Sequence, residues 1–180
     1  LDGTKEFISR TGEFTVNIAL IDGRRPVLGV VHVPVRGETY FACRGRGAFR
    51  ESGKGNAEPI HARRFNGGAA TVVASRSHGN KDTEAFLQSL GKHDVANMGS
   101  SLKFCLVAAG QADVYPRLGP TMEWDTGAAQ CVVEEAGGRV VDVEGQPLLY
   151  NKTDLHNPWF IVSGAGDYDW TQHLPVRQAQ

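Results

Sequence analysis

Two acidic segments, far apart in the chain, have the residue types of a site for a metal ion and a phosphate group. Near its start the chain reads Asp2-Gly3-Thr4. A carboxylate offers the hard oxygen ligands that Mg²⁺ prefers, and a glycine lets the backbone approach a ligand closely. A helix beginning at Thr4 would present free N–H groups to an anion, and the Thr4 hydroxyl could orient a water molecule. The alternative is that Asp2 or Thr4 merely caps this helix.

The second acidic segment is Glu123-Trp124-Asp125-Thr126, where Asp125 stands at the predicted start of a helix over residues 126–136. Asp125 can therefore be interpreted as the N-cap of that helix. Capping and metal binding are compatible, since a carboxylate has two oxygens. We therefore expect Asp2 and Asp125 to belong to one site.

Further polar side chains follow predicted strands in the second half of the chain. Ligands of α/β proteins gather at the carboxyl ends of strands, so these side chains are expected to converge there. Arginine and lysine suit phosphate, the first by paired hydrogen bonds and the second as a compact charge. The alternatives are an N-cap for Ser100, a loop histidine for His78 and a solvated charge for Arg117. The candidates are Ser75, His78, Ser100, Ser101, Lys103 and Arg117.

The elements that must position these residues differ between the two halves. Residues 1–68 are predicted to form an antiparallel meander, and Asp22-Gly23 is the strongest hairpin signal in the chain. Gly45-Arg46-Gly47 is interpreted as a turn, because no strand-to-helix context follows it. After a short helix over 4–9, the predicted strands are 15–21, 25–35, 38–44 and 48–51.

Residues 69–180 alternate strands and helices, which indicates an α/β domain with a largely parallel sheet. We therefore predict two domains, 1–68 and 69–180, of α+β and α/β character. The predicted strands are 71–75, 94–98, 112–115, 139–143 and 160–163, and the predicted helices are 82–90, 101–109 and 126–136.

The composition is that of an ordinary globular protein, with 41% hydrophobic and 22% charged residues. No apolar run approaches the roughly 20 residues that a transmembrane helix needs. A net charge of -1 argues against a general nucleic-acid binder, so metal ions and a few local cations must hold an anionic substrate. Cys43, Cys105 and Cys131 lie far apart, which favours buried, reduced thiols in a cytoplasmic protein and argues against a zinc site.

Together these segments resemble the inositol monophosphatase superfamily of Mg²⁺-dependent, lithium-sensitive phosphatases. In that family an Asp-Pro-x-Asp-Gly-Thr segment and a later Trp-Asp segment share a metal cluster. The likeness is closer to one branch, the 3'(2'),5'-bisphosphate nucleotidases of the bacterial CysQ type. It extends from Leu1 to about Trp159. The matching segments are Asp2 to Phe7, Ser75 to His78, Gly99 to Cys105 and Tyr115 to Arg117.

The resemblance implies a layered α-β-α-β-α sugar-phosphatase fold and hydrolysis of a phosphomonoester by water, without a phosphoenzyme. Mg²⁺ would be held by Asp2, Asp125 and the carbonyl oxygen of Leu1. Thr4 would position the attacking water, so the implied catalytic group is Asp2, Thr4 and Asp125. The residues implied to bind the phosphorylated nucleotide are Gly3, Thr4, Ser75, His78, Ser100, Ser101, Lys103, Arg117 and Asp125.

The family's preceding Asp-Pro and its upstream acidic metal ligands have no counterpart in this sequence. We therefore expect the chain to lack the N-terminal part of the family domain, to bind metal poorly on its own and not to turn over. We also expect one face of the first sheet to lack covering helices. That would leave Val27, Val30 and Val31 partly exposed.

The leading interpretation is a cytoplasmic enzyme, either free or peripheral to the inner membrane, that converts adenosine 3',5'-bisphosphate to AMP and phosphate. The resemblance would place it in sulfur metabolism, with Mg²⁺ as cofactor and a small phosphorylated nucleotide as partner. One alternative is an inositol monophosphatase or a broader sugar phosphatase. The other is a phosphate-binding module without catalysis.

Overall fold

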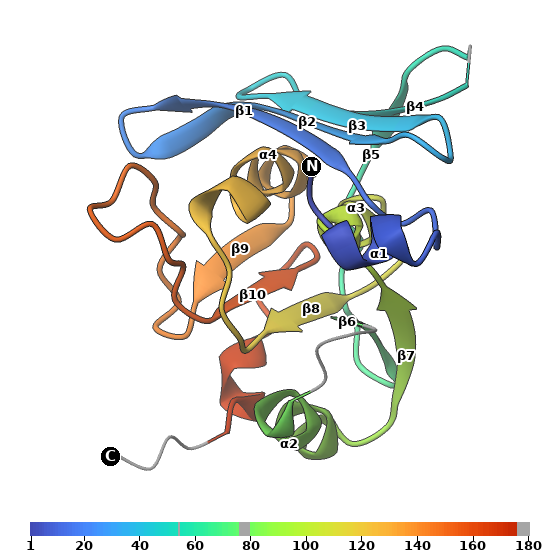
Figure 1. Ribbon diagram of the computed structural model, residues 1–180. Helices are drawn as coiled ribbons and strands as arrows, with labels where there is room; N and C mark the ends of the chain where they lie inside the picture. The colour runs from blue at the N-terminus through green and yellow to red at the C-terminus, as the bar shows by residue number, and fades with distance from the viewer. Residues whose placement is uncertain (54, 76–79, 176–180) are drawn as a thin grey trace.

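The computed structural model describes residues 1–53, 55–75 and 80–175, which form stacked layers of sheet and helix (Figure 1). A five-stranded sheet lies at the top, α3 and α4 lie beneath it, a second five-stranded sheet follows, and α2 lies below (Figure 1). These layers and the mixture of helices and strands confirm the predicted α/β fold class. The described residues contain no helix on the outer face of the first sheet, where the resemblance implies a further layer.

The first sheet is the predicted antiparallel meander. Asp22 pairs with Arg25 across the hairpin that Asp22-Gly23 predicts, and the Gly45 turn joins the third and fourth strands. The last strand was not predicted, because its Glu-Pro-Ile sequence has no strand pattern of its own and relies on pairing with its neighbour. In order, the strands are β1 (Val16–Asp22), β2 (Arg25–Val33), β3 (Glu38–Cys43), β4 (Ala48–Ser52) and β5 (Glu58–Ile60).

The second sheet is mixed, with the order β7-β6-β8-β10-β9. Strand β6 is parallel to both of its neighbours, whereas β10 is antiparallel to both of its own. Because β10 runs against the other four, the sheet is largely parallel in direction but not throughout. The strands are β6 (Ala70–Ser75), β7 (His93–Met98), β8 (Val114–Arg117), β9 (Arg139–Asp142) and β10 (Phe160–Ser163).

The helices differ from the predictions mainly at their starts. Helix α4 begins three residues early, at Glu123, so Asp125 lies inside its first turn and is not the N-cap. The Asp125 carboxylate still accepts the otherwise unpaired N–H of Met122, at 2.9 Å. The helices are α1 (Thr4–Ile8), α2 (Lys81–Leu90), α3 (Leu102–Ala108), α4 (Glu123–Glu135) and the 3₁₀ helix η1 (Trp170–His173).

Helices α3 and α4 hold the two sheets together. A single hydrophobic cluster contains Val31 and Tyr40 of the first sheet, Val107 and Val132 of the helices, and Phe160 of the second sheet. Gly29 permits the close contact, because a Cβ at this position would lie 2.1 Å from the carbonyl oxygen of Ala128. The two halves therefore share one core, and the division at residue 68 stays a prediction.

The outer face of the first sheet carries exposed apolar side chains. Ile18 is 60% exposed and Leu20 58% exposed. Val27 and Val30 are half-buried, as expected, but the prediction for Val31 was wrong. Strand alternation turns Val31 toward α3 and α4, where it is fully buried.

Two predictions from composition can be compared with the structure. Cys105 and Cys131 are buried, but Cys43 is exposed at the end of β3, so the expectation of three buried cysteines was wrong for that residue. Along the described ranges, no helix has the length and apolar character that crossing a bilayer requires.

Candidate active site

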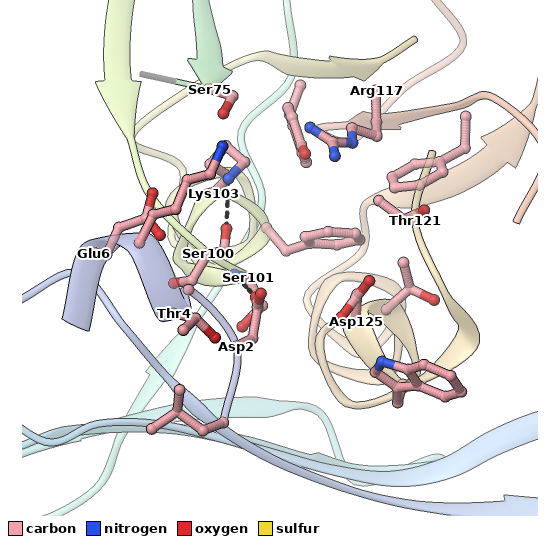
Figure 2. Close-up of a pocket in the computed structure, with 18 residues that line it drawn as sticks. Asp2, Thr4, Glu6, Ser75, Ser100, Ser101, Lys103, Arg117, Thr121 and Asp125 are labelled. Carbon is pink, nitrogen blue, oxygen red and sulfur yellow. Dashed lines mark hydrogen bonds between the residues drawn. The ribbon is translucent and has the colours of Figure 1, made fainter. Parts of the chain in front are cut away.

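One pocket, of about 360 Å³, lies where α1, the β7–α3 turn and the start of α4 meet (Figure 2). Ser75 and Arg117 border it from the carboxyl ends of β6 and β8, the edge at which the sequence pattern placed ligand-binding groups. His78 lies outside the described residues. All other predicted site residues line the pocket: Leu1, Asp2, Gly3, Thr4, Ser75, Ser100, Ser101, Lys103, Arg117 and Asp125.

Asp2 is held by contacts with both halves of the chain. Its backbone exchanges two hydrogen bonds of 2.9 Å with Thr15, and its Oδ2 accepts the N–H of Ser101 at 2.6 Å. The cap position of α1 is taken by Gly3, in a left-handed conformation without a side-chain cap bond. The capping alternative for Asp2 and Thr4 was therefore wrong, and Asp2 presents its carboxylate to the pocket.

Asp125 faces the same space from α4. Figure 2 shows the carboxylates of Asp2 and Asp125 on one side of the pocket, and the nitrogen atoms of Lys103 and Arg117 on the other. One oxygen of Asp125 accepts the Met122 N–H, which fixes the side chain in the first turn of the helix. The two carboxylates that the sequence paired thus share one pocket.

The electrostatics of Asp2 indicate that this pocket suits a cation. Burial raises the pKa of Asp2, and the neighbouring charge of Asp125 raises it further. Lys103 and the Ser101 N–H oppose this rise, while Glu6 adds to it. Since two carboxylates facing each other in a partly desolvated space repel, their oxygens fit a hard divalent ion such as Mg²⁺.

The donor set within the described residues is small. These residues contain no group of three or more His, Cys, Asp or Glu side chains arranged to hold a metal. Glu6 lines the pocket, but Glu123 points away and binds Lys152 Nζ at 2.6 Å. Two carboxylates can therefore hold part of a Mg²⁺ coordination shell.

The raised pKa of Asp2 predicts a stability effect. A carboxyl whose folded-state pKa lies above its unfolded value destabilises the fold when ionised, and this cost disappears as pH falls through the folded pKa. In the absence of Mg²⁺, Asp2→Asn should therefore raise the free energy of unfolding at about pH 7 and have little effect near pH 4. Urea unfolding of both proteins at the two pH values measures this difference.

Asp154 provides the matched control. Hydrogen bonds from His156 lower the pKa of this exposed carboxyl, so Asp154→Asn should not stabilise the protein at neutral pH. If Asp2→Asn proved less stable than the parent at neutral pH, the ionised Asp2 carboxylate would not destabilise the fold.

Lys103 is buried at the side of the pocket. Its side chain is 5% exposed, and its Nζ donates to the carbonyl oxygen of Ser100 at 2.7 Å. Burial lowers the pKa of Lys103 to about 8, although Asp2 raises it in part. The ammonium also lies 5.3 Å from the centre of the Tyr115 ring. A buried cation next to a pocket is suited to an anionic ligand.

Arg117 supplies a second cation. Its Nη2 donates to the carbonyl oxygen of Pro120 at 2.9 Å. Within the described ranges its buried Nε has no hydrogen-bond partner. An unsatisfied buried guanidinium nitrogen is costly, and an anion in the pocket would relieve that cost.

The β7–α3 turn departs from the prediction for Ser100. The cap position of α3 is taken by Ser101, without a side-chain cap bond, and Ser100 adopts the left-handed conformation with φ 46°. Ser101 Oγ instead bonds Thr15 Oγ1 and Asn17 Oδ1, each at 2.8 Å. Ser100 is therefore not the N-cap residue, although its Oγ accepts the Leu102 N–H at 3.4 Å, and both serines link the two halves of the chain.

Several pocket residues were not among the predicted candidates. Glu6 lies in the first turn of α1, four positions after Asp2, and this closeness in sequence could have indicated it. The other additions are Lys5, Phe104, Tyr115, Thr121, Trp124, Thr126 and Phe160. Most of them lie close in sequence to predicted candidates, but only the folded arrangement shows that they line the pocket.

Comparison with known proteins gives a consistent set of matches. A model of the inositol monophosphatase family matches residues 1–167. The 3'(2'),5'-bisphosphate nucleotidase CysQ of Escherichia coli strain K12 is 49% identical over 164 residues, which cover 91% of this chain and 65% of that protein. The chain therefore spans less than two thirds of this relative's length.

Solved structures show the same relationship. The crystal structure of CysQ from Bacteroides thetaiotaomicron, a bacterial member of the inositol monophosphatase family, is 46% identical, with a TM-score of 0.85. The match covers 93% of this chain and 68% of that one. An inositol monophosphatase from Anabaena is 26% identical, with a TM-score of 0.79, and the match covers 97% and 72% of the two chains.

Proposed function

The chain belongs to the inositol monophosphatase family, and on that basis we propose that it acts as a Mg²⁺-dependent 3'(2'),5'-bisphosphate nucleotidase. The proposed reaction converts adenosine 3',5'-bisphosphate and water to AMP and phosphate. One observation carries this proposal. The carboxylates of Asp2 and Asp125 lie on one side of the pocket, and the cations Lys103 and Arg117 lie on the other. The identity with named CysQ nucleotidases supports the choice of substrate.

The pocket offers distinct places for the parts of such a substrate. The phosphate to be cleaved would lie near Asp2 and Asp125, where bound Mg²⁺ would neutralise its charge and lower the pKa of the attacking water. Lys103 and Arg117, on the other side, can bind a second phosphate by charge-assisted hydrogen bonds. A substrate with two phosphates would therefore use both sides of the pocket.

The chain's own residues fix this arrangement. The Ser101 N–H holds Oδ2 of Asp2, and the Met122 N–H holds Oδ2 of Asp125, so each carboxylate keeps its other oxygen for a ligand. The Thr4 hydroxyl, at the first position of α1, lines the pocket and is our candidate for orienting water. The Gly3 turn, with φ 88°, lets the backbone bend at this point.

A second candidate is a phosphate-binding module without turnover. It is favoured by the small donor set, since the described residues bring only Asp2 and Asp125, with Glu6 beside them, to the cation side of the pocket. Binding of phosphate without its release from any ester would identify this second function.

A phosphate-release assay on a full-length protein tests the proposed function. With Mg²⁺ present, turnover of adenosine 3',5'-bisphosphate should exceed that of inositol 1-phosphate by at least about tenfold, because only the first substrate engages both sides of the pocket. Lithium should inhibit the reaction, and removal of Mg²⁺ with a chelator should abolish it. Adenosine 5'-monophosphate, which lacks the 3'-phosphate, serves as the control substrate.

The outcomes separate the candidates. Equal rates on the two substrates would contradict the nucleotidase assignment and favour a broader sugar phosphatase. Phosphate release that persists without any divalent cation would contradict the metal-dependent reaction itself.

A further inference from the structure

Glu13 is a buried acid that the proposed reaction does not use. It lies in the loop between α1 and β1, outside the pocket lining, and is only 6% exposed. Burying a carboxylate is costly unless hydrogen bonds compensate. Its partners therefore show what this side chain does.

Two of its partners belong to the β7–α3 turn. Glu13 Oε2 accepts the N–H of Gly99 at 2.8 Å, and the Glu13 carbonyl oxygen accepts the Ser100 hydroxyl at 2.5 Å. Ser100 adopts φ 46°, a conformation that non-glycine residues rarely occupy without support. Two contacts from one residue hold this turn in a shape that its own sequence does not favour.

The same turn is hydrogen-bonded to two residues of the pocket. The next residue, Ser101, donates its N–H to Oδ2 of Asp2 at 2.6 Å, and the Ser100 carbonyl accepts Lys103 Nζ at 2.7 Å. Gly99 has no room for a side chain, because a Cβ would lie 2.4 Å from Cγ of Glu6. The direction of the turn therefore determines how both Asp2 and Lys103 are oriented.

We propose that Glu13 is a positioning residue, which holds the Gly99–Ser101 turn so that the Ser101 N–H fixes the carboxylate of Asp2. The inference rests on the proposed function, because Asp2 matters in this way only as a metal ligand. Glu13 does not touch substrate or metal. Through the turn, Glu13 orients the carboxylate of Asp2, and so places the oxygen that stays free for a ligand.

Three variants of the full chain test this role. Glu13→Ala removes the carboxylate acceptor, whereas Glu13→Gln keeps an oxygen that can accept the Gly99 N–H. Glu135→Ala is the matched control, since Glu135 accepts the N–H groups of Gly45 and Gly47, each at 3.0 Å, at a turn of the first sheet. All three remove a carboxylate that binds backbone N–H groups.

Amide hydrogen exchange, followed by NMR, gives a readout that needs no turnover. Protection of the Ser101 amide, taken relative to the core amide of Val107, should fall at least about tenfold in Glu13→Ala. It should stay within about threefold of the parent in Glu13→Gln and in Glu135→Ala. The normalisation removes any general loss of stability.

Mg²⁺ titration, followed by the amide shifts of Gly3 and Ser101, gives a second readout. The half-saturating Mg²⁺ concentration should rise about 10- to 100-fold in Glu13→Ala and recover in Glu13→Gln. In preparations that release phosphate, kcat should fall by a similar factor while KM for the bisphosphate stays within about twofold, since Glu13 does not line the pocket.

The results distinguish a failure of this inference from a failure of the proposed function. Unchanged relative protection of Ser101 in Glu13→Ala would overturn the positioning role, whatever the turnover. A loss of protection that Gln does not rescue would overturn the hydrogen-bond account of that role. Absence of nucleotidase activity alongside the expected exchange pattern would contradict the proposed function. The link from Glu13 through the Gly99–Ser101 turn to Asp2 would still be supported.

Discussion

In a full-length protein, replacement of Asp2 or Asp125 by asparagine is expected to reduce Mg²⁺-dependent phosphate release by more than about a hundredfold. Residues that only orient a metal ligand typically contribute about 10- to 100-fold, so loss of a charged ligand itself should cost more. Asparagine keeps the shape and can still accept the N–H of Ser101 or Met122, so the fold should persist. Steady-state rates over a range of Mg²⁺ concentrations measure the loss.

The reference for this experiment is an aspartate outside the pocket. Asp142 accepts the N–H groups of Glu144 and Gln146 through Oδ1, as Asp2 and Asp125 accept backbone N–H groups, but it is the last residue of β9. Asp142→Asn should therefore keep near-parental activity. If either pocket variant retained comparable activity at limiting Mg²⁺, the metal-ligand assignment of that residue would be wrong.

Arg117→Ala is expected to raise KM for adenosine 3',5'-bisphosphate about 10- to 100-fold, and to change KM for a simple monophosphate much less. A hydrogen bond to a charged group contributes roughly 1.5–3 kcal/mol, and only the larger substrate reaches the side of the pocket where Arg117 lies. His78→Ala, at a position outside the described residues, is predicted to act in the same direction. Initial rates on the two substrates give both KM values.

Two further variants separate charge from geometry. Arg117→Lys keeps the positive charge but loses the planar guanidinium, so it should recover only part of the lost affinity. Arg46→Ala removes an exposed arginine at the Gly45 turn and should change neither KM. Equal losses on both substrates in Arg117→Ala would indicate that Arg117 contacts the phosphate common to both, and would favour the broad phosphatase.

Much of the fold could be predicted from local patterns. Short runs of β-branched and apolar residues, with the Asp22-Gly23 turn, predicted the meander of the first sheet, because strand propensity and turn chemistry are encoded within a few neighbouring residues. Less local features were missed. Strand β5 depends on pairing with β4, and the early start of α4 depends on the Asp125 side chain reaching back to Met122.

The sequence alone also determined which residue types could do chemistry. Asp2, Asp125, Lys103 and Arg117 were selected by type and by their positions next to predicted elements, and the structure places all four at one pocket. His78 lies outside the described residues, and the roles of the other candidates stay predictions. The likeness to the inositol monophosphatase family was carried by the same motifs and is confirmed by the family match.

Only the tertiary structure decided how these residues are held. Asp2 and Ser101 are 99 positions apart, and Glu13 and Gly99 are 86 apart, yet each pair shares a hydrogen bond. No local pattern encodes such contacts, because they form only when α3 and α4 pack between the sheets and bring the start of the chain onto the β7–α3 turn. A buried glutamate such as Glu13 gives no signal in the sequence, since its role depends on a backbone N–H that another part of the fold supplies.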